Sequence, residues 1–472
     1  MNTSQISNVL LVSFDAFRLD RTFHFTESDC PHVSELLNDS TYFSKHISTG
    51  SGTSTSFPGI LASSLPLEYG YRGLSEDHCP IAERLSRNNV YTIGITAQTS
   101  CSSLFNYDTG FDRFFDSVGS NSSNTKSFIK EKVANIVRDT PVESPTKAIY
   151  DLIKNHDNPP YIQADEVTDR TIDLLFPKIK QSNQTFAWIH YMEPHAPYYP
   201  PTKFIKQYHN GNHDLSSINK LINRWNRERG PVGSPKNMDI FTPDERSSII
   251  DFYDAQAAFA VEEFERLISK LKESGELKRT AIIITSDHGE EHFEHNDFGH
   301  RPKMIEELIH VPLWIRLPEN PDLDTLCSFD NITSHLDLSP TITELFGCEP
   351  SDQWQGNSLV SALETNDPTR NYAVSELSHK SGLGGDVRPE ELIISVRGKT
   401  WKYVLNKQEN REYLYQVGEG IDHENVIDKY PGKAKELKHF CEQRISNINK
   451  VEADSIDIDS GVEDRLRRLG YK

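Results

Sequence analysis

The sequence lacks paired cysteines, a long apolar run and an excess of positive charge. Its six cysteines, in a chain of 472 residues, are scattered without the close spacing of a metal site or a disulfide framework, so we expect reduced thiols in a cytoplasmic protein. No apolar stretch is long enough to cross a bilayer, and the first residues carry neither the basic segment nor the cleavage site of a signal peptide. We therefore expect no membrane anchor.

The balance of charges limits the partners of this chain. There are 50 Lys and Arg against 70 Asp and Glu, which gives a formal net charge of −20. A non-specific nucleic-acid binder needs a basic surface to neutralise phosphates, so we expect no nucleic-acid partner. An anionic substrate would need local help, such as a metal ion. The 36% of hydrophobic residues is typical of a globular enzyme with a large core.

Short, nearly continuous apolar runs alternate with helical patterns along the chain. Runs of this kind are typical of strands covered on both faces, which predicts an α/β fold with a mostly parallel sheet between helix layers. Residues from about 243 to 273 carry apolar side chains at intervals of three and four, which predicts a long amphipathic helix before the last of these strands. The four predicted core strands are 9–14, 90–95, 186–189 and 281–285.

The pattern changes after about residue 368. Shorter strand-like pieces at 392–396 and 400–405 precede a charged helical tail, so we predict a catalytic α/β domain over 1–367 and a small antiparallel subdomain with its tail over 368–472. Two polar stretches, 118–165 and 205–242, show no sustained apolar pattern. We interpret them as insertions over the sheet, where substrate specificity often lies.

Polar residues follow two of the predicted strands directly. Asp15 ends the first strand, and Asp287 and His288 follow the last one. Ligands of open α/β sheets gather at the carboxyl ends of strands, so these residues can converge, and two carboxylates with an imidazole could hold a metal ion. An aspartate after a strand is also a common helix cap or turn former.

The stretch 50–66 is rich in glycine and hydroxyl side chains. Ser56 can cap a helix and Pro58 suits a first helical turn, so we predict that a helix starts just after Thr53. A hydroxyl there lies beside the N–H groups and the positive dipole of a helix N-terminus, which suits a phosphate or sulfate group. Because a hydroxyl is a poor nucleophile, Thr53 would have to lie on the metal ion. An ordinary Ser/Thr-rich loop is the alternative.

Two further stretches contain histidine pairs. His190 and His195 follow a predicted strand in a proline-bounded turn, where they could donate to substrate oxygens or to a leaving group, although a lone histidine is usually structural. His288 and His292 match the inverted zinc-protease pattern His-x-x-Glu-His. That pattern needs a helix, and a glycine after a β-branched run disfavours one here.

Taken together, these stretches resemble the sulfatase-like branch of the alkaline-phosphatase superfamily from about residue 8 to residue 415. The resemblance rests on ordered pieces: 8–20, the Thr53 loop, 190–195, 285–290, Gly299-His300, 310–313 and 334–341. It implies an alkaline-phosphatase-like sheet and one divalent cation, Zn²⁺, Mn²⁺, Mg²⁺ or Ca²⁺. The implied ligands of the cation are Asp15, Thr53, Asp287 and His288.

The resemblance also implies roles in catalysis. Thr53 matches the nucleophile, and His195 and His300 match residues that contact the oxygens of the ester. His190 and Arg18 are further candidates for substrate binding. The expected substrate is a small anionic ester or an ester on a glycan.

The departures from the family favour phosphate over sulfate. Sulfatases that use formylglycine carry Cys or Ser at the position of Thr53, and threonine cannot be converted to formylglycine. The Lys and His that such sulfatases place after the next strand are missing from 96–100, which reads TAQTS. We therefore expect a phosphate-ester hydrolase or transferase. A sulfate-ester hydrolase without formylglycine and a catalytically silent anion-binding protein are the alternatives.

Overall fold

The computed structural model describes most of the chain. The described residues are 6–26, 29–68, 73–118, 159–181, 184–228, 240–318, 326–378, 387, 389–418 and 424–448. Most of the predicted insertion 118–165 and the end of the predicted tail therefore lie outside the described residues. All six cysteines lie inside them, and none of the six forms a disulfide there.

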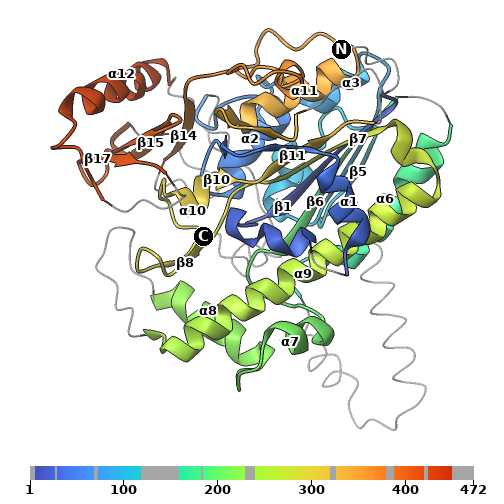
Figure 1. Cartoon of the computed structure of the whole chain (residues 1–472), viewed down its shortest axis with the longest axis horizontal. Helices are drawn as coiled ribbons and strands as arrows, with labels where there is room; N and C mark the ends of the chain where they lie inside the picture. Colours follow the sequence, from blue (N-terminus) through green and yellow to red (C-terminus); the bar gives the residue numbers. More distant parts are fainter. Residues whose placement is uncertain are drawn as a thin grey trace.

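An eight-stranded sheet forms the centre of the molecule (Figure 1). In spatial order its strands are β12 (Ser328–Phe329), β2 (Thr41–Phe43), β11 (Leu313–Arg316), β7 (Thr280–Ser286), β1 (Asn8–Asp15), β6 (Thr185–Pro194), β4 (Tyr91–Thr96) and β5 (Arg113–Phe115). β1 pairs in parallel with β6 and β7, and β4 pairs in parallel with β6 and β5, whereas β11 is antiparallel to both of its neighbours. The predicted mostly parallel sheet is confirmed.

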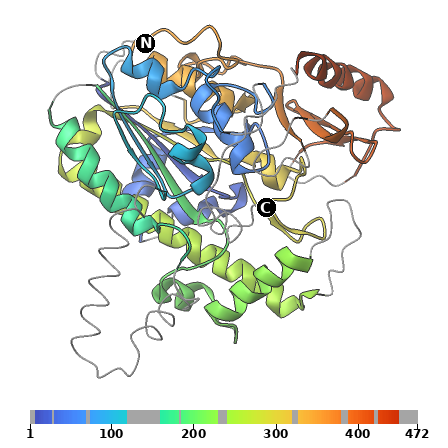
Figure 2. The ribbon, with the colours of Figure 1, turned by 180° about the vertical axis from the view of Figure 1, so that it is seen from behind.

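Helices cover both faces of this sheet, as Figures 1 and 2 show. One face carries α1 (Pro31–Asn38), α6 (Ala164–Ile179) and α9 (Pro243–Glu273), and the other carries α2 (Thr53–Ala62), α3 (Ile81–Ser86) and α11 (Leu338–Leu345). Alternate residues of β1 point to opposite faces of the sheet, so Leu10 packs on the α9 side and Leu11 on the α2 side. All eight residues of β1 are buried, which explains why its apolar run is nearly continuous.

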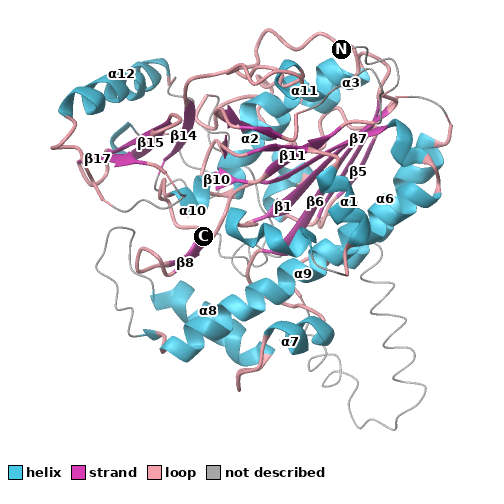
Figure 3. Cartoon of the chain, in the orientation of Figure 1, coloured by secondary structure: helices cyan, strands magenta, loops and turns pink. Residues whose placement is uncertain are grey.

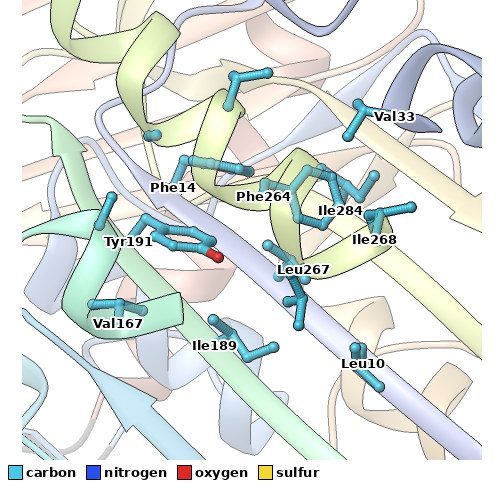
Figure 4. Packing of buried hydrophobic residues seen from close by; sticks show 14 of the residues in the cluster. Leu10, Phe14, Val33, Val167, Ile189, Tyr191, Phe264, Leu267, Ile268 and Ile284 are labelled. Atoms are coloured by element: carbon cyan, nitrogen blue, oxygen red, sulfur yellow. The ribbon is translucent and has the colours of Figure 1, made fainter. Parts of the chain in front are cut away.

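The long helix α9 confirms the predicted amphipathic segment. It begins after Thr242, whose side chain and that of Glu245 form a reciprocal capping box. Its apolar side packs against the sheet, where the rings of Phe264 and Phe14 lie 5.9 Å apart (Figure 4).

The stretch 205–242 differs from its prediction, because part of it has a clear apolar pattern. Helix α8 (Leu215–Glu228) buries Ile218, Leu221, Ile222 and Trp225, which lie one and two turns apart. These side chains pack with Ile249, Phe252 and Tyr253 of α9. Four apolar positions in a polar stretch are enough for a buried face, and the polar composition concealed them.

A separate four-stranded antiparallel sheet follows the elements of the large sheet along the chain (Figure 3). Its strands are β14 (Ala373–Ser378), β15 (Leu392–Arg397), β16 (Trp401–Asn406) and β17 (Arg411–Gln416), and α12 (Pro431–Asn447) packs on it. This confirms the predicted small antiparallel sheet; the boundary at residue 368 stays a prediction. No helix in the described ranges combines the length and the apolar character needed to cross a membrane.

Shorter elements complete the description. They are η2 (Leu19–Thr26), β3 (His46–Ile47), η3 (Thr99–Cys101), η4 (Ser103–Phe105), α7 (Thr202–Tyr208), η7 (Glu276–Arg279), β8 (Glu291–His292), β9 (Phe298–Gly299), α10 (Glu306–Ile309), β10 (His310–Val311), β13 (Thr333–Ser334), η8 (His335–Asp337), η9 (Ser361–Leu363) and η10 (Pro389–Glu391).

Candidate active site and metal centre

Four of the predicted site residues meet at the carboxyl ends of the central strands. Asp15 ends β1, and Asp287 and His288 follow β7, its parallel neighbour, so the sheet brings them together. Thr53 is the first residue of α2, as predicted, with Gly52 at the N-cap. The prediction for Ser56 and Pro58 was wrong in detail, because both lie inside α2 and not at its first turn.

The side chains of these residues form a buried cluster. The imidazole Nε2 of His288 lies 3.4 Å from the Thr53 hydroxyl, 3.5 Å from Oδ1 of Asp15 and 3.6 Å from Oδ2 of Asp287. Asp15, Asp287 and His288 each offer one ligand atom, and these three atoms lie within 4.8 Å of one another. This spacing is compatible with one shared cation.

The hydrogen bonds of the cluster leave one oxygen of each carboxylate open. Asp287 uses Oδ1 to accept the backbone N–H of Ala16 at 3.1 Å and that of His288 at 2.8 Å. Asp15 uses Oδ2 to accept the amide of Gln98 at 2.6 Å. The other oxygens, Oδ1 of Asp15 and Oδ2 of Asp287, are buried and accept no hydrogen bond from the described residues.

The ring of His288 turns its Nε2 nitrogen toward the cluster. Its Nδ1 lies 2.7 Å from the carbonyl of Gly289, so Nδ1 carries the proton and Nε2 turns its lone pair to the cluster. Buried polar atoms without partners cost free energy, and a divalent cation would satisfy the two open carboxylate oxygens. An imidazole nitrogen and a hydroxyl beside them complete a donor set that suits such a cation. The residues present therefore fit a divalent metal ion.

The two carboxylates differ in their protonation. Burial and the neighbouring Asp15 raise the pKa of Asp287 well above its usual range. Burial acts in the same direction on Asp15, but His195, His190 and His288 outweigh it and lower its pKa. Two carboxylates this close in a dry site do not both ionise readily, which is what a cation would change.

Three further histidines surround the cluster. In β6, Nδ1 of His190 lies 2.9 Å from the hydroxyl of Ser13 and its Nε2 lies 3.6 Å from Oδ2 of Asp15. The His300 ring lies 4.6 Å from the ring of His288 and 4.8 Å from that of His195. Burial lowers the pKa of His195 to about 4. The structure thus brings all three together with the cluster, and their roles stay predictions.

Arg18 makes extensive contacts with the protein itself. Its guanidinium donates to Asp20 at 2.8 Å, to Glu294 at 2.8 Å and to the carbonyl of Glu290 at 2.6 Å. These bonds tie the end of β1 to the β8–β9 hairpin, which leads to His300. They indicate a positioning role; the predicted substrate contact of Arg18 stays a prediction.

Two site residues were missed in the sequence. The Gln98 side chain donates to Asp15, and Oε2 of Glu290 lies 3.4 Å from Nδ1 of His300. Burial raises the pKa of Glu290 to about 7. Gln98 follows β4, so its position after a strand of the same sheet was a usable signal.

The inverted zinc-protease pattern finds no helix here. His288 lies after β7, and His292 lies in β8. The His292 ring packs against Tyr253, with ring centres 4.5 Å apart, and against Phe298. The two histidines therefore do not share the helix face that this pattern requires.

Known proteins resemble this chain in sequence. The sequence model of the Sulfatase family matches residues 7–348. "Uncharacterized sulfatase YidJ" of Escherichia coli (strain K12) is 24% identical over 60% of this chain and 54% of its own length. Arylsulfatase K of Xenopus laevis is 28% identical over 42% of this chain and 37% of its own length. The matches thus span about half or less of these relatives.

Solved structures share the fold over nearly the whole chain. Phosphonate monoester hydrolase SpPMH from Silicibacter pomeroyi has a TM-score of 0.68 at 20% identity, covering 93% of this chain and 94% of its own. BT4656, solved with its substrate D-glucosamine-2-N,6-O-disulfate, has a TM-score of 0.69 at 16% identity, covering 94% and 98%. The family match extends over most of the chain and includes all the elements that carry the cluster. This chain belongs to the sulfatase family.

Proposed function

We propose that this chain is a metal-dependent hydrolase or transferase of phosphate esters, phosphodiesters or phosphomonoesters, with Thr53 as its nucleophile. The observation that supports this most directly is that the Thr53 hydroxyl lies 3.4 Å from Nε2 of His288, beside two carboxylate oxygens that have no hydrogen-bond partner among the described residues. Asp15, Asp287, His288 and Thr53 would hold the cation. A bound divalent cation would lower the pKa of the hydroxyl and stabilise negative charge on the ester oxygens.

Threonine at position 53 favours phosphorus over sulfur as the reacting centre. Its side chain has no route to formylglycine, so its own oxygen has to act. Among the structural neighbours, the phosphonate monoester hydrolase acts at phosphorus, which agrees with this preference. Sulfate esters, as in the complex of BT4656, are the competing substrate class.

The proposed chemistry proceeds in two displacements. In the first, Oγ1 of Thr53 forms a bond to phosphorus, the bond from phosphorus to the alcohol oxygen of the ester breaks, and the hydroxyl proton of Thr53 passes to water. The N-terminus of α2, where Thr53 lies, turns the positive end of the helix dipole toward the phosphoryl oxygens. His300 gives a proton to the departing alcohol, whereas His195, which its lowered pKa keeps neutral near pH 7, forms hydrogen bonds to the ester oxygens. In the second, water or an acceptor alcohol forms a bond to phosphorus and releases its proton, the bond between phosphorus and Oγ1 of Thr53 breaks, and Oγ1 takes up a proton to become a hydroxyl again.

Metal analysis and matched substrates test the proposal. The purified protein is assayed for bound metal and for turnover of nitrophenyl phosphate, bis-nitrophenyl phosphate and nitrophenyl sulfate, before and after chelation. We expect phosphate-ester turnover that needs metal and is lost in Thr53→Ala, by at least about a thousandfold as for loss of a nucleophile. Ser54→Ala, which removes the neighbouring hydroxyl of the same helical turn, is the matched control and should keep most of the rate.

The other outcomes separate the alternatives. Turnover of the sulfate ester alone would replace the phosphate proposal by a sulfatase. Near-normal turnover in a folded Thr53→Ala protein would refute the nucleophile. Bound metal without turnover of any ester, with tight binding of inorganic phosphate, would indicate a silent anion-binding protein.

A further inference from the structure

Gln98 connects a neighbouring strand to the candidate metal centre. It is fully buried, follows β4 and caps η3. Its Oε1 accepts the backbone N–H of Ser100 at 3.3 Å, while its Nε2 donates to Oδ2 of Asp15 at 2.6 Å. Each end of the amide thus has a partner of the opposite kind, which defines its orientation.

Asp15 presents two oxygens with different surroundings. Oδ2 accepts from Gln98 and lies 3.6 Å from Nε2 of His190. Oδ1 accepts no hydrogen bond from the described residues and lies 3.5 Å from Nε2 of His288. The bond from Gln98 therefore engages one oxygen and leaves the other to face the cluster.

The second carboxylate is oriented differently. Asp287 is held by the backbone N–H groups of Ala16 and His288, which no side-chain substitution removes. The short hydrogen bond to Asp15, in contrast, comes from the side chain of Gln98 at 2.6 Å, and Nε2 of His190 lies farther from the same oxygen, at 3.6 Å. A change at position 98 should therefore act on one ligand of the pair.

The charge of the donor matters as well as its geometry. A glutamine amide donates a hydrogen bond without adding positive charge beside the carboxylate. A lysine at this place would form an ion pair with Asp15 and compete with a cation for the same carboxylate. A neutral donor orients Asp15 and leaves its negative charge for the metal.

We propose that Gln98 is a positioning residue for Asp15, which it orients so that Oδ1 faces the divalent cation. This inference rests on the proposed metal site. Partners of this kind around a metal ligand typically change the affinity for the metal by 10–100-fold. Gln98 thus sets how tightly the centre holds its cation, without touching the cation itself.

Calorimetric titration of the metal-free protein with Mn²⁺ tests the proposal. We expect Gln98→Leu to weaken Mn²⁺ binding by about 10–100-fold, and Gln98→Lys to weaken it further because of its charge. Asn8→Leu is the matched control. Asn8 is a buried amide at the end of β1 opposite to Asp15, and its side chain donates to Thr280. This variant should change stability and leave the Mn²⁺ affinity within about twofold.

The outcomes separate this inference from the proposed function. If the wild-type protein binds Mn²⁺ and folded Gln98→Leu and Gln98→Lys bind it equally well, the role of Gln98 is refuted and the metal site stands. If the control weakens binding as much as Gln98→Leu, the effect is a general loss of stability and the role is again refuted. If the wild-type protein binds none of Mn²⁺, Zn²⁺, Mg²⁺ and Ca²⁺, the metal site itself fails, and this inference with it.

Discussion

Space, and not backbone conformation, requires glycine at position 289. A Cβ added there would lie 2.0 Å from the carbonyl oxygen of Glu307, which belongs to the backbone and cannot turn away. The N–H of Gly289 donates to the carbonyl of Leu308 at 2.9 Å, and its own carbonyl orients the His288 ring. The close approach thus determines where a candidate metal ligand points.

Gly289→Ala should therefore disturb both stability and the metal centre. We expect a loss of about 1–3 kcal/mol in the free energy of unfolding, as for other overpacked sites, together with weaker Mn²⁺ binding. Denaturant unfolding and calorimetric titration measure the two effects. Gly432→Ala, in the first turn of α12, where an added Cβ meets nothing within 4 Å, is the control; it should leave Mn²⁺ binding unchanged and should not lower stability. A Gly289→Ala protein with wild-type affinity for Mn²⁺ would contradict the argument.

At the scale of elements, a buried carboxyl joins the end of β6 to helix α6. Glu193 is fully buried, and its Oε1 accepts the N–H of Ala164, the first residue of α6, at 3.0 Å. The positive end of the helix dipole favours a carboxylate there, but burial dominates and raises the pKa of Glu193 to about 8. Glu193 lies two residues before His195, so this joint also supports the loop of a candidate catalytic histidine.

The raised pKa predicts how stability depends on pH. Between the ordinary carboxyl pKa of 4.5 and about 8, the unfolded chain releases a proton that the native Glu193 retains, so its contribution to stability is full below 4.5 and declines as pH rises to 8. Glu193→Gln should flatten this part of the profile. The decline in the free energy of unfolding that it removes is about 1.4 kcal/mol for each unit by which the native pKa exceeds that of the unfolded chain. Denaturant unfolding from pH 4 to 9 measures it. Glu166→Gln, an exposed carboxyl in the first turn of α6, should leave the decline in place; an unchanged profile in Glu193→Gln would contradict the assignment.

The elements themselves were predictable to different degrees. The strands and α9 carry long or regular apolar patterns, so their type and approximate bounds follow from local sequence. Helix α8 also carries the spacing of an amphipathic helix, at Ile218, Leu221, Ile222 and Trp225, and these side chains pack against α9. Because only four apolar residues in a polar stretch carry this spacing, the prediction of an insertion without an apolar pattern overlooked it.

At the scale of the whole molecule, the C-terminal sheet contacts the segments on both sides of α2. The backbone N–H of Glu376 donates to the carbonyl of Thr49 at 2.9 Å, and its side chain accepts the N–H of Leu67 at 2.9 Å. Arg444 of α12 pairs with the carboxylate of Glu376 at 2.8 Å and with that of Glu68 at 2.6 Å. The small sheet thus helps to hold the helix that begins at Thr53.

Breaking the ion pair between Arg444 and Glu376 should therefore disturb the candidate active site. Arg444→Met leaves the fully buried Glu376 without its partner, which typically costs about 3–5 kcal/mol. We expect lower stability and slower phosphate-ester turnover, and partial recovery of both in the double variant with Glu376→Gln. Lys433→Ala, which removes an exposed pair in α12, is the control and should change stability by less than about 0.5 kcal/mol. Turnover that stays at the wild-type rate in folded Arg444→Met would contradict the link to α2.

The sequence by itself determined the α/β fold, the parallel core strands and the residues that meet at the candidate centre. Apolar runs identify strands locally, and polar residues at the ends of parallel strands must converge at one edge of the sheet. For this reason the sequence predicts that Asp15, Asp287 and His288 can converge, and in the structure one ligand atom of each lies within 4.8 Å of the others.

Only the tertiary structure decided how these groups are oriented. Which oxygen of Asp15 is engaged depends on Gln98, which comes from another strand, and the guanidinium of Arg18 is occupied by Glu290 and Glu294 from beyond β7. Such contacts join segments distant along the chain, and no local pattern records them. Their geometry depends on packing between those segments, and packing sets which atoms remain open to a metal ion or a substrate.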